Sequence, residues 1–200
     1  MRTLSAGWRM KYISGGTAKG CIFCSGAQAK ADLANMIVVR GGRSFVMMNR
    51  YPYTTGHLMV APYRHVGKLS DLKPDEACEI MDLVRLCEAL LREALHADGL
   101  NVGINIGRCA GAGYPGHVHV HVVPRWNGDT NFMPVVSETR VLPETLTDTY
   151  RKITRVLRRA ARNSPDQAWT GRTSGKVGAA RRAGRRARAP VSARQGRGRR

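Results

Sequence analysis

The stretch GHVHVHVVPRW, residues 116–126, holds three of the six histidines of the chain at alternate positions, with valines between them. Alternation with a period of two is typical of a β-strand, because residues i, i+2 and i+4 then point to the same face. We therefore predict that His117, His119 and His121 line one face of a strand and that the intervening valines fill the opposite, buried face. Histidine is costly to bury without partners. The row of three therefore indicates metal binding or phosphoryl chemistry rather than a solvent-exposed strand face that happens to carry histidines.

The sequence around this stretch predicts a small α+β fold. A pair of adjacent glycines separates two apolar runs and indicates a β-hairpin, and a long helix begins at a proline and stops at a glycine. The predicted strands are residues 36–40, 43–48, 56–61, 100–107 and 116–126, and the predicted helices are residues 74–98 and 144–162. We expect an antiparallel sheet of about five strands with the long helix packed on it.

The net charge of +19 is unevenly distributed. Residues 1–150 hold 16 basic and 13 acidic residues, whereas residues 151–200 hold 17 basic residues and one acid. Hydrophobic periodicity ends near residue 163, which predicts a catalytic domain over residues 1–163 and a disordered basic tail, rich in Arg, Ala and Gly, over residues 164–200. The tail is either an electrostatic arm that contacts nucleic acid or polyphosphate, or a solvated segment with no partner.

The composition also bears on the compartment. We expect no membrane association, because no run of 18 apolar residues occurs, and no secretion, because the first 16 residues lack an apolar signal segment. Five cysteines favour reduced thiols or metal ligands over disulfides, which predicts a cytoplasmic protein. Three of them are expected to be structural, acting as small hydrophobes: Cys78, Cys87 and Cys109.

The first two cysteines, Cys21 and Cys24, have the spacing of a zinc knuckle near the N-terminus. A tetrahedral zinc ion needs two more ligands, and His65 and His117 are the best candidates because each lies at an end of a predicted strand. Thiolate and imidazole ligands together favour zinc. A redox pair or a chance spacing would also explain the two cysteines, although the βαβ context of a thioredoxin-like motif is missing.

The remaining histidines lie beside a glycine-rich loop, GAGYPG, at residues 111–116. Backbone N–H groups of such a loop can hold a phosphate against the imidazoles. A neutral histidine can attack phosphorus and form a covalent phosphoramidate, provided that its second ring proton is held by a backbone carbonyl. Asn105, in the strand before the loop, is a candidate for a further amide contact.

Four motifs together resemble the histidine triad (HIT) superfamily of nucleotide hydrolases and transferases. The triad itself matches, NRYPYTTGHLMVAP is similar to the ribose-side strands of the Fhit-like branch, and the CxxC with APYRH is similar to zinc-bearing members. The stretch VVPRWNGDTNFMPV resembles the bacterial diadenosine tetraphosphate phosphorylase branch, also called ATP adenylyltransferases. The resemblance runs from Trp8 to about Arg140 and implies the HIT-like fold and a two-fold homodimer.

The resemblance also implies roles for individual residues. It makes His119 the nucleophile that attacks the α-phosphate to give adenylyl-histidine, with His121 and His57 assisting at the phosphates and the leaving group. Asn49 would hold the ribose. Further substrate contacts are expected at Met47, Asn105 and Gly113, and structural zinc at Cys21, Cys24, His65 and His117. Many members carry glutamine where this chain has Gly113, which leaves open whether water or inorganic phosphate attacks the intermediate.

The sequence thus predicts an enzyme that cleaves adenine dinucleoside polyphosphates. Phosphorolysis of diadenosine tetraphosphate to ADP and ATP is the first hypothesis, and hydrolysis to AMP and ATP is the second. A nucleoside phosphoramidase would use the same triad. Two hypotheses from different classes are a nucleotide-binding module with a nucleic-acid-binding tail, and a metal hydrolase in which the HxH pair holds a catalytic zinc.

Overall fold

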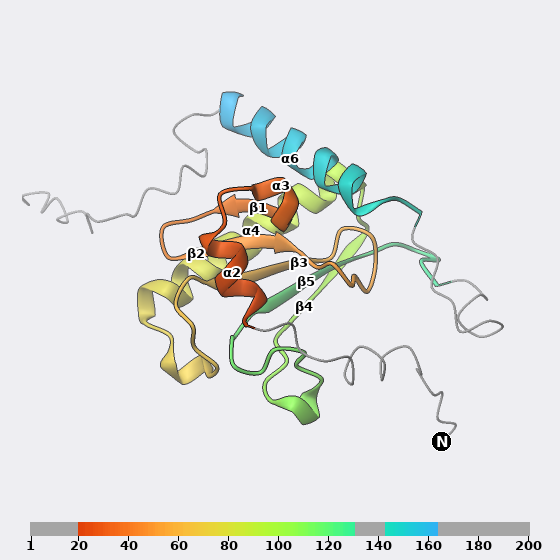
Figure 1. The fold of residues 1–200 in the computed structure, drawn as a ribbon. Helices are drawn as coiled ribbons and strands as arrows, with labels where there is room; N and C mark the ends of the chain where they lie inside the picture. Colours follow the sequence, from red (N-terminus) through yellow and green to blue (C-terminus); the bar gives the residue numbers. More distant parts are fainter. Residues whose placement is uncertain (1–19, 131–142, 164–200) are drawn as a thin grey trace, which may run out of the picture.

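The computed structural model describes residues 20–130 and 143–163 and contains one five-stranded antiparallel sheet (Figure 1). The order of the strands across the sheet is β1-β2-β3-β5-β4, so β4 lies at an edge. Their bounds are β1 Ile37–Arg40, β2 Ser44–Met48, β3 Leu58–Pro62, β4 Gly99–Gly103 and β5 Val120–Arg125. The predicted α+β class and five-stranded sheet are confirmed.

Two long helices lie on one side of this sheet (Figure 1). Helix α4, Pro74–Leu95, starts with a proline in its first turn, and the Glu76 carboxylate accepts the backbone N–H of Lys73 at 2.8 Å. Helix α6, Leu146–Asn163, packs on α4, and its Tyr150 hydroxyl donates to the carbonyl of Ile37 in β1 at 2.9 Å. These contacts fix α6 to both the helix and the sheet.

Two short helices were not predicted: the first covers the other side of the sheet, and the second lies beside β1. They are α2, Ile22–Gln28, and α3, Asp32–Asn35. Seven and four residues show too little of the 3.6-residue period to be recognised, and neither helix has a side-chain cap. The Arg40 guanidinium joins them, because it donates to the carbonyls of Ala27 and Ala29 and to the Asp32 carboxylate.

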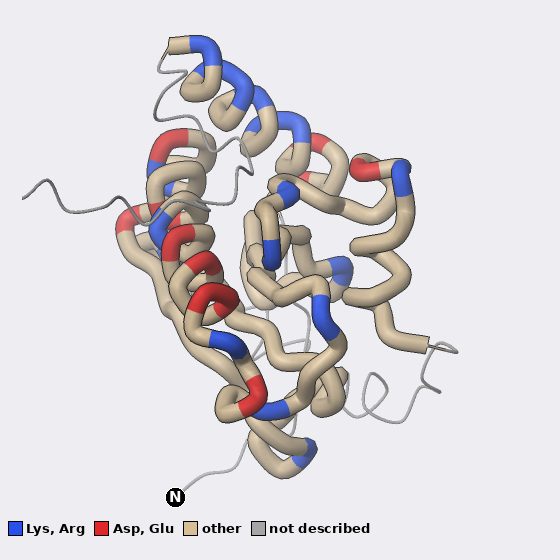
Figure 2. Tube along the Cα trace, turned by 90° about the vertical axis from the view of Figure 1, so that its left-hand side faces the viewer, with Lys and Arg blue, Asp and Glu red and all other residues tan. Residues whose placement is uncertain are grey.

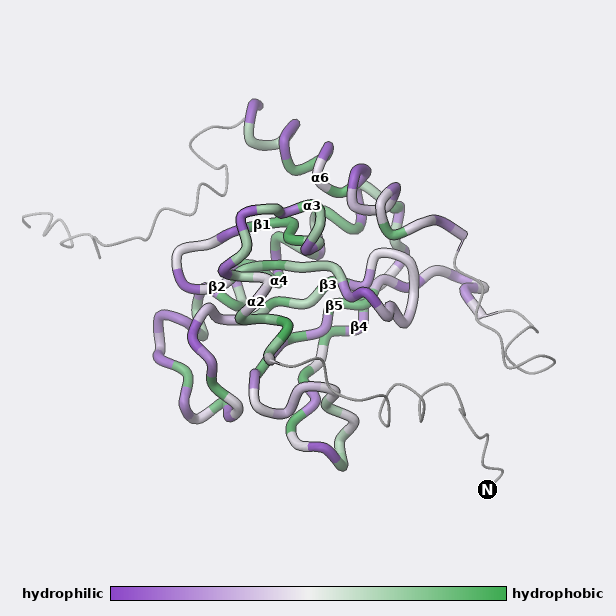
Figure 3. The backbone as a smooth tube through the Cα atoms, in the orientation of Figure 1, coloured by the Kyte–Doolittle hydropathy of each residue, from purple (hydrophilic) through white to green (hydrophobic). Residues whose placement is uncertain are grey.

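The alternation of side chains along the strands produces two apolar clusters, one on each face of the sheet. The cluster under α4 and α6 includes Val46, Leu58, Val60, Leu83, Leu91, Val122 and Ile153. The cluster under α2 consists of Phe23, Ile37, Phe45, Met47, Met59 and Ala61. Figure 3 shows the strands mostly in the hydrophobic colours and α6 with a hydrophilic outer side. Because both faces are covered over β1, β2 and β3, nearly all side chains of these strands are buried, whereas β4 at the edge is mostly exposed.

Several sequence-based boundaries and one side-chain expectation were wrong. Strand β4 ends at Gly103 rather than at residue 107, and α4 ends at Leu95 because His96 adopts a left-handed conformation, φ 53°. Of the three cysteines expected to be buried, only Cys87 is, whereas Cys78 and Cys109 are exposed. Cys78 lies on the outer face of α4, and Cys109 lies in a short 3₁₀ turn, Arg108–Ala110, outside the core.

Charge is segregated between the two long helices (Figure 2). Acidic residues gather on α4 and basic residues on α6, and the two helices are joined by an ion pair between Glu93 and Arg159. No helix in the described parts of the chain is long and apolar enough to cross a membrane. The predicted tail at residues 164–200 lies outside the described residues.

Candidate functional site

The histidine-rich segment is only partly a strand. Strand β5 starts at Val120, so His119 lies just before it and His117 lies in the bend that leads into it. Two residues beyond the last β3–β5 pair, the register would oppose Val118 to Pro62, which has no N–H to donate. The N–H of Val118 donates to the carbonyl of Val66 instead, at 2.7 Å. The alternation persists, because Val118, Val120 and Val122 are all buried, the last two in the cluster under α4 and α6.

The first two histidines are buried as deeply as these valines. His117 is 1% exposed and His119 is 5% exposed. Phe23 of α2 covers both, with ring centroids 5.0 Å from His117 and 4.6 Å from His119. Phe23 therefore helps to keep water from the site, a role that sequence analysis missed because no pattern marked α2 as a helix.

Hydrogen bonding fixes the protonation of His119. Its Nδ1 lies 2.8 Å from the carbonyl oxygen of His117, and a carbonyl can only accept, so Nδ1 carries the proton. Burial lowers the pKa of His119, which keeps the ring neutral near pH 7. The lone pair is therefore on Nε2, which is the protonation expected for a nucleophilic histidine.

A second chain of hydrogen bonds runs from Tyr53 through His57 to His121. The backbone N–H of Tyr53 donates to Nδ1 of His57 at 3.2 Å, and the amide nitrogen of Asn49 lies 3.3 Å from the same atom. Nε2 of His57 then carries the proton and donates to Nδ1 of His121 at 2.9 Å. As a result, the remaining ring proton of His121 is on Nε2.

Both histidines of this chain are neutral near pH 7. Burial, together with the neighbouring imidazoles of His121 and His119, lowers the pKa of His57 to about 3. Burial likewise lowers the pKa of His121 to about 4. A neutral His121 is a hydrogen-bond donor through Nε2 without bringing a full positive charge into the site.

The predicted zinc ligands come together. Cys21 precedes α2, Cys24 lies in its first turn, His65 follows β3 and His117 precedes β5. Their ligand atoms all lie within 4.8 Å of one another. Nδ1 of His117 is 3.3 Å from the sulfur of Cys21, and Nδ1 of His65 is 3.3 Å from the sulfur of Cys24.

The two sulfur–nitrogen distances of 3.3 Å fit a tetrahedral zinc ion. Bonds of about 2.0–2.3 Å place the ligand atoms of such an ion about 3.3–3.8 Å apart. Nε2 of His117 donates to the carbonyl of Pro62 at 2.9 Å, which leaves the lone pair on Nδ1, the atom that faces the thiols. The four residues can therefore hold the ion, with His117 oriented by a backbone contact.

The predicted substrate-contact residues lie at different depths. Met47 is buried in the cluster under α2. Asn105 follows β4 instead of lying in it, and it lines a cleft that begins at His121. Gly113 is exposed in the loop before the histidines. Asn49 is half-buried, and its side-chain oxygen accepts the N–H of Tyr51 at 2.9 Å.

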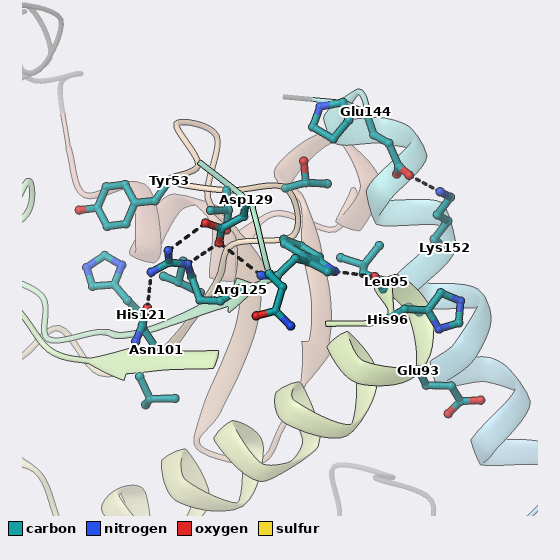
Figure 4. A pocket seen from close by; sticks show the side chains of 18 of the residues that line it. Tyr53, Glu93, Leu95, His96, Asn101, His121, Arg125, Asp129, Glu144 and Lys152 are labelled. Carbon is teal, nitrogen blue, oxygen red and sulfur yellow. Dashed lines mark hydrogen bonds and ion pairs between the residues drawn. The ribbon is translucent and has the colours of Figure 1, made fainter. Parts of the chain in front are cut away.

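The cleft has a volume of about 1200 Å³ and extends from His121 past the end of β5 to α6 (Figure 4). Arg125 lies between the two ends and makes a two-pronged ion pair with Asp129, at 2.5 and 3.0 Å. It also donates to the Asn101 side chain at 2.9 Å. The turn after β5 is thus held rigidly beside the histidines.

Comparisons with known proteins agree with this geometry. Residues 30–128 match the family model of the HIT domain. The chain is 37% identical over 152 residues to a Mycobacterium tuberculosis protein named AP-4-A phosphorylase, covering 72% of this chain and 78% of that one. It is 34% identical over 101 residues to the asymmetrical bis(5'-nucleosyl)-tetraphosphatase of Schizosaccharomyces pombe, covering 50% of this chain and 55% of that one.

A solved structure supports the same assignment. The crystal structure of a zinc-bound histidine triad family protein from Mycobacterium smegmatis superimposes with a TM-score of 0.58 and 26% identity, covering 72% of this chain and 97% of that one. The matched fold is the sheet with its packed long helix, the framework that holds the histidines described above. The chain therefore belongs to the HIT domain family.

Proposed function

We propose that this protein cleaves diadenosine tetraphosphate by phosphorolysis, through an adenylyl group carried on His119. The observation that carries the proposal is the hydrogen bond from Nδ1 of His119 to the carbonyl of His117, at 2.8 Å, which leaves Nε2 free to attack phosphorus. The named activity of the M. tuberculosis relative, at 37% identity, favours this substrate.

The reaction would proceed in two displacements. Nε2 of His119 attacks the α-phosphorus of one adenosine, the bond from that phosphorus to the bridging oxygen breaks, and ATP leaves. An oxygen of inorganic phosphate then attacks the same phosphorus, the P–N bond breaks, and ADP leaves with His119 restored. The Nε2–H of His121 would donate to phosphate oxygens during both steps, and His57 would hold His121 in the required tautomer.

Product analysis tests the choice of acceptor. With inorganic phosphate, we expect equal amounts of ADP and ATP from diadenosine tetraphosphate. Without phosphate, adenine-labelled substrate should leave an acid-labile label on the protein that added phosphate releases as ADP. Release of AMP and ATP at the same rate with or without phosphate would favour hydrolysis, the second hypothesis, which the S. pombe relative's name represents.

The competing functions that the sequence suggests have less support. A catalytic metal held by His119 and His121 would need a lone pair from each ring, but Nδ1 of His121 accepts from His57 and its Nε2 carries the proton, so only His119 offers one. Among the described residues, the one group of potential metal ligands is the cluster of two cysteines and two histidines. A nucleoside phosphoramidase and a nucleotide-binding module would be distinguished by the labelled product above.

We also propose that Cys21, Cys24, His65 and His117 bind a structural zinc ion. A zinc ion bound there would tie α2 to the segment that contains His119. We expect about one zinc per chain by elemental analysis of protein purified without chelator. Cys24→Ser should lose the metal and lower the melting temperature by roughly 10 °C or more, because a structural site contributes folding energy.

The matched control for this experiment is Cys78→Ser, which makes the same chemical change at an exposed cysteine of α4. It should leave the zinc content and the melting temperature unchanged. A metal-free wild-type protein, or equal effects of the two variants, would contradict the zinc assignment.

The remaining features stay predictions. A two-fold homodimer is supported by β4, an edge strand whose Val102 is exposed along with nearby Ile106. Asn49 is proposed to hold the ribose, with Met47, Asn105 and Gly113 as further substrate contacts. A cytoplasmic location, the domain boundary at residue 163 and contact of the tail with nucleic acid or polyphosphate are likewise proposals.

A further inference from the structure

The cleft beyond His121 is larger than one phosphate site requires. It continues from the histidines along β5 and ends at α6, about 1200 Å³ in all. Figure 4 shows His121 and Tyr53 at one end and Lys152 with Glu144 at the other. Nothing in the proposed attack on the α-phosphate uses the part of the cleft beyond His121.

The floor of the cleft is a rigid strand face. His121, Val123 and Arg125 alternate along β5 and all line the cleft, so Arg125 lies about 13 Å from His121 along the strand. Arg125 uses three of its five N–H groups on Asp129 and Asn101. A guanidinium fixed in this way has N–H groups left to donate to a further acceptor.

Aromatic side chains line the same path. Tyr53 is stacked near His121, with ring centroids 5.8 Å apart. Trp126 follows Arg125, and its indole N–H donates to the carbonyl of Leu95 at the end of α4, at 3.1 Å. Aromatic rings held in place beside cationic groups are suited to a nucleobase attached to phosphates.

The far wall is the basic face of α6. Four residues at helical spacing line the cleft there: Lys152, Arg155, Val156 and Arg159. Lys152 pairs with Glu144 and Arg159 pairs with Glu93. Arg155 is exposed, and no residue in the described parts of the chain makes an ion pair or hydrogen bond with it. Its guanidinium is available to a phosphate.

We propose that this cleft binds the second nucleotide of the substrate, the half that leaves as ATP, with Arg155 contacting its phosphates and Trp126 contacting its nucleoside. The inference rests on the proposed function and extends it, since it assigns recognition of the leaving half to β5 and α6. Discrimination between a dinucleotide and a simple adenylyl ester then depends on residues outside the triad.

A kinetic comparison of two substrates tests the inference. Diadenosine tetraphosphate would occupy the cleft, whereas the p-nitrophenyl ester of AMP has no second nucleotide. Arg155→Gln should lower kcat/KM for the dinucleotide about 10-fold, as expected for one charge-assisted contact, and leave the ester unchanged. The control is Arg158→Gln, which removes an exposed charge from α6 outside the cleft and should change neither substrate.

A binding measurement separates this inference from the catalytic proposal. Trp8 and Trp169 are replaced with Phe in the full chain, so that Trp126 is the sole tryptophan, and ATP is titrated against its fluorescence. We expect saturable quenching whose Kd rises about 10-fold in Arg155→Gln and stays the same in Arg158→Gln. Inorganic triphosphate, as a second titrant, should compete with ATP but quench less.

Each outcome has a definite reading. Arg155-dependent quenching in a protein that never forms adenylyl-histidine would support the cleft and reject the proposed function. Normal cleavage of the dinucleotide by Arg155→Gln, or quenching that both arginine variants weaken equally, would overturn the cleft assignment and leave the proposed function intact.

Discussion

Replacing His119 with alanine is expected to reduce the turnover of diadenosine tetraphosphate by about 10⁴-fold or more, because the covalent route disappears with its nucleophile. The neighbouring imidazoles cannot take over. Nδ1 of His121 accepts the proton of His57, and His117 faces the thiols of the zinc cluster. Steady-state rates and the absence of trapped adenine label would be measured together.

Folding must be controlled, because His119 is 5% exposed and packs against Phe23. His119→Gln keeps most of the volume and should be equally inactive while melting near the wild-type temperature. His119→Gly leaves a cavity of about the size of an imidazole, and added imidazole should restore part of the turnover. Retention of more than a few per cent of wild-type turnover by a folded alanine variant would contradict the adenylyl-histidine mechanism.

The sequence predicted the parts of this molecule that follow from regular patterns. The hairpin of β1 and β2 was marked by Gly41-Gly42, and α4 by Pro74 and its apolar spacing, so both were found within a few residues. The antiparallel pairing of β4 with β5 followed from the glycine-rich loop that joins the two segments. Patterns of this kind are local, and local propensity decides them.

The grouping of the candidate metal ligands was predicted, but the geometry of the histidine segment was predicted less well. The spacing of Cys21 and Cys24 indicated a metal site, and the structure brings His65 and His117 to them. The regular alternation suggested a single strand through His117, whereas the pairing of β3 with β5 ends at Val60 and Val120, before Pro62 is reached. A proline in the partner strand ends the pairing, and register between distant strands cannot be read from either segment alone.

Several features of the site could not be predicted from the sequence. Phe23 covers the histidines only because α2, which has no cap and too few turns to show a period, folds over the sheet. The His57–His121 contact joins residues 64 positions apart. The cleft combines β5 with α6, whose basic face could equally have been a solvated surface. Such features depend on tertiary packing.

The hydrogen bond from His57 to His121 predicts a second large loss of kcat, in variants of either residue. His121→Ala should lower kcat by about 10²–10³-fold, the loss expected for one hydrogen-bond donor in the transition state. His57→Leu should have a comparable effect, because without the donor at Nδ1 the proton of His121 is free to move to that atom and the donor at Nε2 is lost. His57→Gln keeps an amide donor and should recover much of the activity.

A double-mutant cycle shows whether the two residues act as one unit. If His57 acts only through His121, the variant carrying both His57→Leu and His121→Ala should be no slower than His121→Ala alone. Once His121 is gone, the hydrogen bond through which His57 acts no longer exists. Melting temperatures are needed for every variant, since His57 is fully buried. If the two reductions in kcat multiply, so that the double variant loses about 10⁴-fold or more, His57 must contact the substrate itself. His57 would then be a catalytic residue in its own right, and the tautomer of His121 would have to be set by another group.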